Sequence, residues 1–151
     1  MGKKAAALTL VIAFLVAVGI GTAGCSTAEG KGKVKWLTDW TEALNRAQDQ
    51  NKPMVIYFYT DMCPACLRLE QNAFSDDELS AFLNKNFICL ESNAGRSTLH
   101  ARYGIDGTVP TTVFSTSDGY QKNYELARIV GAAPADHFYQ VALAVLEGVQ
   151  G

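Results

Sequence analysis

The sequence predicts an α/β domain in which helices cover both faces of a central mixed β-sheet. Segments with apolar residues three and four positions apart alternate with short runs rich in β-branched and aromatic residues. One such run, Met54–Tyr59, contains no polar break, which is typical of a strand buried on both faces. Turn-forming residues separate the segments, and the expected order is α-β-α-α-β-α-β-β-α.

In the first half of the chain, one strand is expected between helices. The first helix begins after a cap at Thr38 or Asp39 and ends before Pro53. The strand covers residues 54–59, and a second helix runs from Pro64 to about Asn72. A third helix begins within residues 75–78. Residues expected to face the core are Trp40, Ala43, Leu44, Ala47, Leu79, Phe82 and Leu83.

The second half of the chain contains the remaining strands. Residues 87–90, 111–114 and 126–130 read as strands, with a turn at 117–119. A short helix over residues 98–103 is expected to end at Gly104. Pro134 opens the final helix, whose expected apolar set is Phe138, Val141, Leu143 and Leu146.

Composition excludes several classes of protein. The chain has 151 residues, of which 48% are apolar and 19% charged, so it is neither disordered nor of low complexity. Its net charge of −2 argues against a nucleic-acid partner, which would require a basic excess. The sequence has no glycine-rich phosphate loop, and no diffusible cofactor is expected. The length fits one domain.

The N-terminus has the layout of an export signal. Lys3 and Lys4 precede an apolar run over residues 5–20, and small residues lead to Cys25. The run has 16 residues, fewer than the roughly 20 that span a bilayer. The segment resembles a bacterial lipoprotein signal, in which the cysteine becomes the lipidated first residue. Thr22 departs from that pattern, because a larger apolar residue is usual there.

These features divide the chain into three parts. Residues 1–24 are predicted to be a lipoprotein-type signal peptide, and residues 25–34 a flexible tether. The domain is predicted to cover residues 35–148. An ordinary cleaved signal and an uncleaved membrane anchor are the alternatives to lipidation at Cys25. All three place the domain outside the cytoplasm, in the cell envelope.

The candidate chemistry lies at Cys63-Pro64-Ala65-Cys66, between a buried strand and a helix. Two intervening residues put the two cysteines within disulfide reach when the segment is helical. Cys63 falls at the helix start, where unpaired N–H groups and the helix dipole favour an anion. Such a position lowers a thiol pKa from about 8.5 into the range of about 3.5–7.5. Cys63 is therefore the predicted nucleophile, and Cys66 the residue that resolves a mixed disulfide.

Paired thiols have four other possible uses in a protein. Haem attachment needs a histidine directly after the second cysteine, and Leu67 occupies that position. A metal site would need further ligands, and no second close Cys/His pair is present in the sequence. A copper-binding module without exchange activity remains an alternative. Another alternative is a structural lipoprotein in which the two cysteines form a disulfide that only stabilises the fold.

The sequence resembles the thioredoxin superfamily over about residues 36–146. The segments that carry the resemblance are Tyr57-Phe-Tyr-Thr-Asp-Met-Cys-Pro-Ala-Cys66 and Tyr103-Gly-Ile-Asp-Gly-Thr-Val-Pro-Thr111. Asp61, Glu70 and Phe74-Ser-Asp76 make it similar to the C-terminal thioredoxin-like domain of DsbD reductases and their free-standing exported relatives. The resemblance implies a thioredoxin fold, a cis peptide before Pro110 and substrate contacts at Val109, Pro110 and Met62.

The sequence departs from this family at two positions near the dithiol. Met62 stands where tryptophan is common, and Tyr57 stands where many members have a buried aspartate that exchanges a proton with the second cysteine. Glu70, four residues after Cys66 on the same helix face, is the candidate to take over part of that role. The alternative for Glu70 is an ordinary surface carboxylate.

The other cysteine and both histidines are expected to be structural or exposed. Cys89 reads as a small apolar residue within a strand. His100 and His137 lie on predicted helices without companion ligands.

Together these observations predict an exported thiol–disulfide oxidoreductase that acts by dithiol exchange. Its expected partners are client proteins with disulfides or thiols, a membrane redox protein, and the membrane through Cys25. The resemblance to a reductase domain favours reduction of clients over oxidation.

Overall fold

The predicted mixed sheet is present and has four strands in the order β2-β1-β3-β4. The structure is a computed structural model that describes residues 32–119 and 124–150. The central strand β1 pairs in parallel with β2 and antiparallel with β3, and β3 pairs antiparallel with β4. The strands are β1 (Met54–Tyr59), β2 (Ile88–Asn93), β3 (Thr111–Ser115) and β4 (Glu125–Val130).

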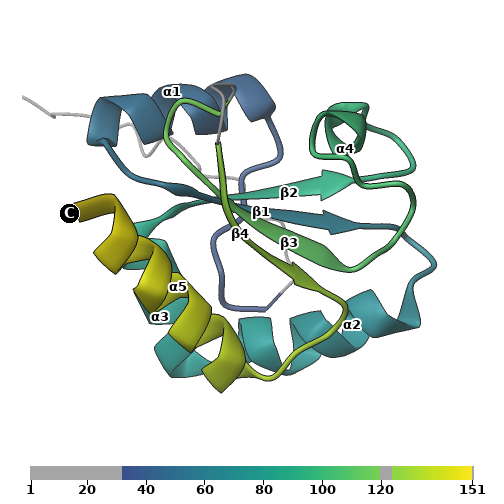
Figure 1. The fold of residues 1–151 in the computed structure, drawn as a ribbon. Helices are drawn as coiled ribbons and strands as arrows, with labels where there is room; N and C mark the ends of the chain where they lie inside the picture. Colours follow the sequence, from purple (N-terminus) through teal and green to yellow (C-terminus); the bar gives the residue numbers. More distant parts are fainter. Residues whose placement is uncertain (1–31, 120–123, 151) are drawn as a thin grey trace, which may run out of the picture.

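Helices cover both faces of this sheet (Figure 1). One face is covered by α1 and α4, and the other by α2, α3 and α5. The helices are α1 (Trp40–Gln50), α2 (Pro64–Gln71), α3 (Asp77–Asn86), α4 (Leu99–Arg102) and α5 (Ala135–Gln150), and a 3₁₀ turn, η1 (Ala73–Ser75), follows α2.

The side chains of β1 pack alternately into two separate hydrophobic cores, one on each face of the sheet. Val55 and Tyr57 pack on the side of α2, α3 and α5. Met54, Ile56 and Phe58 pack on the side of α1 and α4, together with Ala43 and Ala47 and other apolar residues. Because both faces of β1 are covered, its sequence has no polar alternation. The prediction that residues 54–59 form a strand buried on both faces is confirmed.

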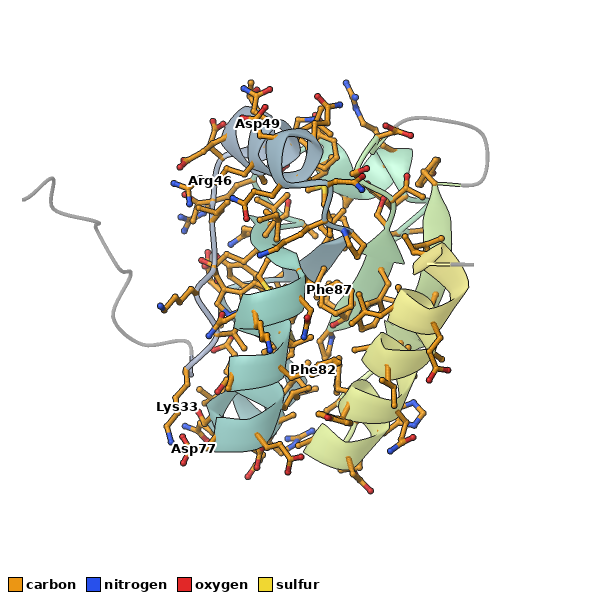
Figure 2. The ribbon with its side chains drawn as sticks, turned by 90° about the vertical axis from the view of Figure 1, so that its left-hand side faces the viewer. Lys33, Arg46, Asp49, Asp77, Phe82 and Phe87 are labelled. Carbon is orange, nitrogen blue, oxygen red and sulfur yellow. A yellow bond between two sulfur atoms is a disulfide. The ribbon has the colours of Figure 1, made fainter. Side chains whose placement is uncertain are left out.

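Residues just before the predicted boundary at residue 35 pack against the domain. Val34 is buried, and the backbone N–H of Lys33 donates to Phe74 O at 2.7 Å. The Lys33 side chain pairs with Asp77 at the start of α3, as Figure 2 shows. Residues 33 and 34 therefore pack against the domain, although the tether was expected to reach residue 34. The predicted signal peptide and Cys25 lie outside the described residues.

Two elements differ in detail from the sequence expectation. Strand β2 extends to Asn93 and thus includes Glu91 and Ser92, whereas only residues 87–90 were expected. On α5 the buried residues are Phe138, Ala142 and Val145, a spacing of four and three, whereas Val141, Leu143 and Leu146 of the expected apolar set are half-buried.

The packing of α5 on α3 accounts for the half-buried aromatics at this interface. The rings of Phe82 and Tyr139 are 4.5 Å apart, and Figure 2 shows Phe82 in the space between the two helices. Within the described residues, no helix has the length and apolar content needed to cross a bilayer.

Candidate active site

Cys63 and Cys66 form a disulfide at the N-terminal end of α2. Their Cα atoms are 5.2 Å apart, which lies within the usual range for a disulfide. Cys63 is the N-cap residue, and the backbone N–H of Cys66 donates to Cys63 Sγ at 3.1 Å. Pro64 occupies the first helical position, where a backbone N–H would have no hydrogen-bond partner within the helix, so its absence costs nothing. The Cys63 sulfur therefore lies where the helix N-terminus stabilises a negative charge.

The two cysteines differ in accessibility. Cys66 is 2% exposed and packs in the core on the side of α2, whereas Cys63 is half-buried at its edge. Met62, directly before Cys63, is 94% exposed. An incoming disulfide can therefore reach Cys63, while Cys66 is screened by the domain.

The loop before β3 lies against the reactive sulfur. The Val109–Pro110 peptide bond is cis, as the family resemblance implied. Val109 O lies 3.8 Å from Cys63 Sγ, and Pro110 is buried. Pro110 O accepts a hydrogen bond from the Gly131 N–H at 2.8 Å, which ties this loop to the end of β4. The fold thus brings Met62, Cys63, Cys66, Val109 and Pro110 together.

Glu70 is buried rather than on the surface. Its side chain belongs to the last turn of α2, its residue exposure is 8%, and Glu70 Oε1 accepts a hydrogen bond from the Tyr57 hydroxyl at 3.0 Å. Tyr57 is fully buried among the rings of Trp36, Tyr59 and Phe74. Burial, reinforced by the nearby carboxylates of Glu70 and Glu91, holds the pKa of Tyr57 far above its ordinary value. The phenol is therefore a hydrogen-bond donor at every physiological pH.

The turn before Cys63 is held by the end of β2 and the loop that follows it. Asp61 accepts hydrogen bonds from Asn93 Nδ2 at 2.9 Å and Arg96 Nη2 at 2.6 Å. The backbone N–H of Ala94 donates to Tyr59 O at 2.8 Å. These contacts join residues more than thirty positions apart, and no local sequence pattern indicates a role for Asn93 or Arg96.

The remaining cysteine and the histidines lie where the sequence predicted. Cys89 is buried in β2, and desolvation raises the pKa of its thiol to about 12. His100 Nδ1 lies 2.6 Å from Ser97 O, and His137 is exposed. Across residues 32–119 and 124–150, no three His, Cys, Asp or Glu side chains form a group able to hold a metal ion.

A family model described as a thioredoxin-like domain matches residues 40–146. The chain belongs to this thioredoxin-like family. The match begins with α1, covers the whole sheet and includes most of α5, so the fold and the Cys63–Cys66 site fall within it.

Curated relatives of this thioredoxin-like chain include the thiol:disulfide interchange protein DsbD. The protein from Yersinia pestis (strain Pestoides F) is 34% identical over 99 residues, which cover 62% of this chain and 16% of that protein. Mouse spermatogenesis-associated protein 20 is 30% identical over 86 residues, or 57% of this chain and 10% of that protein. The chain thus matches a sixth or less of the length of these relatives.

Solved structures agree with the family assignment. A thioredoxin from Thermus thermophilus aligns with a TM-score of 0.63 and 25% identity, covering 77% of this chain and 90% of that one. A putative disulphide-isomerase from Bacteroides thetaiotaomicron gives a TM-score of 0.63 and 26% identity, covering 80% and 98%. The oxidised C-terminal domain of Neisseria meningitidis DsbD shares the fold, with a TM-score of 0.59 and 20% identity over 72% and 97%.

Family membership and the paired cysteines together define the activity. The protein is a thioredoxin-like thiol–disulfide oxidoreductase, and its redox pair is Cys63 and Cys66.

Proposed function

We propose that this protein is an exported reductant that transfers electrons from a membrane redox protein to disulfides in client proteins. The observation that carries the proposal is the asymmetry of the Cys63–Cys66 pair. Cys63 is the accessible cap of α2, and Cys66 is buried behind it. The resemblance of the sequence to the thioredoxin-like domain of DsbD reductases favours the reducing direction. The charged start, apolar run and small residues before Cys25 support export and lipidation at Cys25.

In the proposed cycle, the Cys63 thiolate attacks one sulfur of a client disulfide. A Cys63–client bond forms, the client disulfide breaks, and the released client sulfur leaves as a thiolate. Cys66 then loses its proton and attacks Cys63 Sγ, which regenerates the Cys63–Cys66 disulfide and frees the second client thiol. Two electrons have passed to the client. A dithiol on the membrane partner returns the pair to the reduced state by the same exchange in reverse.

We assign substrate contact to Met62, Val109 and Pro110. Val109 O lies beside Cys63 Sγ, so a client chain that runs past the sulfur meets the main chain of Val109. Met62 presents a nearly fully exposed apolar side chain next to the same sulfur. Desolvation of this side chain by a client favours binding.

We assign the proton of Cys66 to Glu70. The two residues lie one turn apart on the same face of α2, and both are buried. Because water is largely excluded from this region, a carboxylate within the fold is the suited acceptor when Cys66 becomes a nucleophile.

Turnover and cellular redox state together test the function. The purified mature protein, reduced beforehand, should reduce a protein disulfide such as that of insulin, and Cys63→Ser should abolish this activity. In the cell, alkylation and gel shift should find the pair mostly reduced, and oxidised when the membrane donor is absent. A mostly oxidised pair would contradict the reducing direction. Stoichiometric copper binding without turnover would instead support a metal-binding module.

A separate experiment tests the membrane anchor. Cells given a labelled fatty acid should incorporate it into the wild-type chain, and Cys25→Ala should abolish both labelling and membrane association. Cys89→Ala is the matched control, because it also removes one cysteine outside the redox pair. Labelling that persists in Cys25→Ala would contradict lipidation at this residue.

A further inference from the structure

The Tyr57–Glu70 hydrogen bond links the central strand to the helix that carries the redox pair. Tyr57 lies on β1 and Glu70 on α2, thirteen residues apart, and the two side-chain oxygens are 3.0 Å apart. Tyr57 and Cys66 belong to the same buried cluster. The bond thus joins a group that touches no solvent to the residue that we assign as proton acceptor of Cys66.

The surroundings make this hydrogen bond important for the carboxyl group. The Tyr57 ring stacks on Tyr59 at 5.5 Å and meets Trp36 and Phe74 at 5.6 and 5.1 Å. A carboxylate that is buried in such a setting needs hydrogen-bond donors from the protein in place of water, because a buried polar group without a partner costs free energy. Tyr57 supplies such a donor.

Tyr57 itself cannot accept the proton of Cys66. Burial and the adjacent carboxylates raise its pKa, so the hydroxyl keeps its hydrogen across the working pH range. A group that is always protonated donates and does not act as a base. This separates two roles, in which Glu70 exchanges the proton and Tyr57 holds Glu70.

We propose that Tyr57 is a positioning residue for the resolving step, which holds the Glu70 carboxylate on α2 through the hydrogen bond from its hydroxyl. The proposal rests on the proposed role of Glu70 in dithiol exchange. In the step itself, the Cys66 proton moves to Glu70, the Cys66–Cys63 bond forms and the Cys63–client bond breaks. Tyr57 remains protonated throughout, and the departing client thiolate or water later takes the proton from Glu70.

Two further titratable groups surround the phenol. Glu91 on β2 is paired in register with Tyr57 across the parallel strands and is buried. Tyr59 lies two residues further along β1, at the solvent side of the cluster. Both groups raise the pKa of Tyr57 further.

The test separates the two chemical steps in the full mature chain. When reduced protein is mixed with excess small aromatic disulfide, one thiol is released on attack by Cys63 and a second on resolution by Cys66. Tyr57→Phe keeps the ring and removes the donor. It should leave the first phase unchanged and raise the pH midpoint of the second phase by about one to two units. This shift corresponds to the free energy that a hydrogen bond to a charged group contributes. Tyr139→Phe, on α5, is the matched control.

A double-mutant cycle distinguishes positioning from packing. In a Glu70→Gln background, Tyr57→Phe should have no additional effect on the second phase, because its action passes through Glu70. A Tyr57→Phe protein that melts at a lower temperature but keeps the wild-type pH midpoint would overturn the proposal. If Glu70→Gln leaves the second phase unchanged, the proton assignment fails as well. Dithiol exchange itself fails only if Cys63→Ser still releases both thiols.

Discussion

The main-chain oxygen of Val109 lies 3.8 Å from the Sγ atom of Cys63. The contact joins residues 46 positions apart, because β3 lies next to β1 in the sheet and begins where the chain leaves Pro110. The reactive sulfur is therefore flanked by a polar main-chain edge on one side and by the exposed Met62 side chain on another. A client chain can meet both.

Met62 provides a test of client contact. Met62→Ser should raise KM for a protein disulfide about fivefold, since partial desolvation of such a side chain contributes roughly 1 kcal/mol. The rate with a small disulfide should not change, because it makes no contact beyond the sulfur. Steady-state assays with the two substrates check this. An equal loss with both substrates would point to a damaged redox pair and contradict a binding role.

Arg96 provides a test of the turn before Cys63. Arg96→Gln leaves the Asp61 carboxylate, two residues before the nucleophile, without its cationic partner. The uncompensated negative charge should slow alkylation of reduced Cys63 at pH 7 by about twofold, as expected for a charge near a half-buried thiolate that solvent can reach. Arg46→Gln breaks an ion pair on α1 and is the control. Equal alkylation rates in both variants would show that Asp61 does not influence Cys63.

Cys89 provides a test of alkaline stability. Burial raises the pKa of its thiol from 9.0 to about 12, so the folded state keeps the proton where the unfolded state releases it. The contribution of the protonated Cys89 thiol to the free energy of unfolding is fully present below about pH 9. It is lost as pH rises toward about 12, at about 1.4 kcal/mol per pH unit. Urea unfolding at pH 8 and pH 10 should show a larger loss in wild type than in Cys89→Ala. Parallel losses in both proteins would contradict this linkage.

Phe138 provides a test of the core on the side of the sheet that α2, α3 and α5 cover. It is fully buried and meets Phe74 with ring centroids 5.3 Å apart, so Phe138→Ala should lower the free energy of unfolding by about 3–5 kcal/mol. Val149→Ala, half exposed on the same helix, should cost less than about 0.5 kcal/mol. Denaturant unfolding of the oxidised proteins measures both. A small loss at Phe138 would show that α5 is not packed on this core.

Local patterns were sufficient to predict most of the elements. The unbroken apolar run of β1 identified the central strand, and Pro64 after Cys63 marked the start of α2. The cis bond before Pro110 followed from resemblance alone, since no local pattern of residues specifies it. The inner face of α5 was predicted less well, because nearly every residue of its last turns is apolar and the helical period selects no unique face.

The contacts that tune the site were not visible in the sequence. Tyr57 was noted as a departure and Glu70 as a candidate, yet nothing local indicates that their oxygens meet. The partners of Asp61 are Asn93, the last residue of β2, and Arg96 on the loop that follows, and their proximity depends on the parallel pairing of β1 with β2. Such pairs arise from topology, and sequence periodicity reports only which face a residue occupies.

Trapping the mixed disulfide tests the division of roles between the two cysteines most directly. Reduced Cys66→Ser and Cys63→Ser proteins are each incubated with a client carrying one disulfide, and intact mass is measured under non-reducing conditions. Attack by Cys63 predicts a covalent client adduct in Cys66→Ser and none in Cys63→Ser. An adduct that forms through Cys66 alone, or in neither variant, would contradict a nucleophilic Cys63.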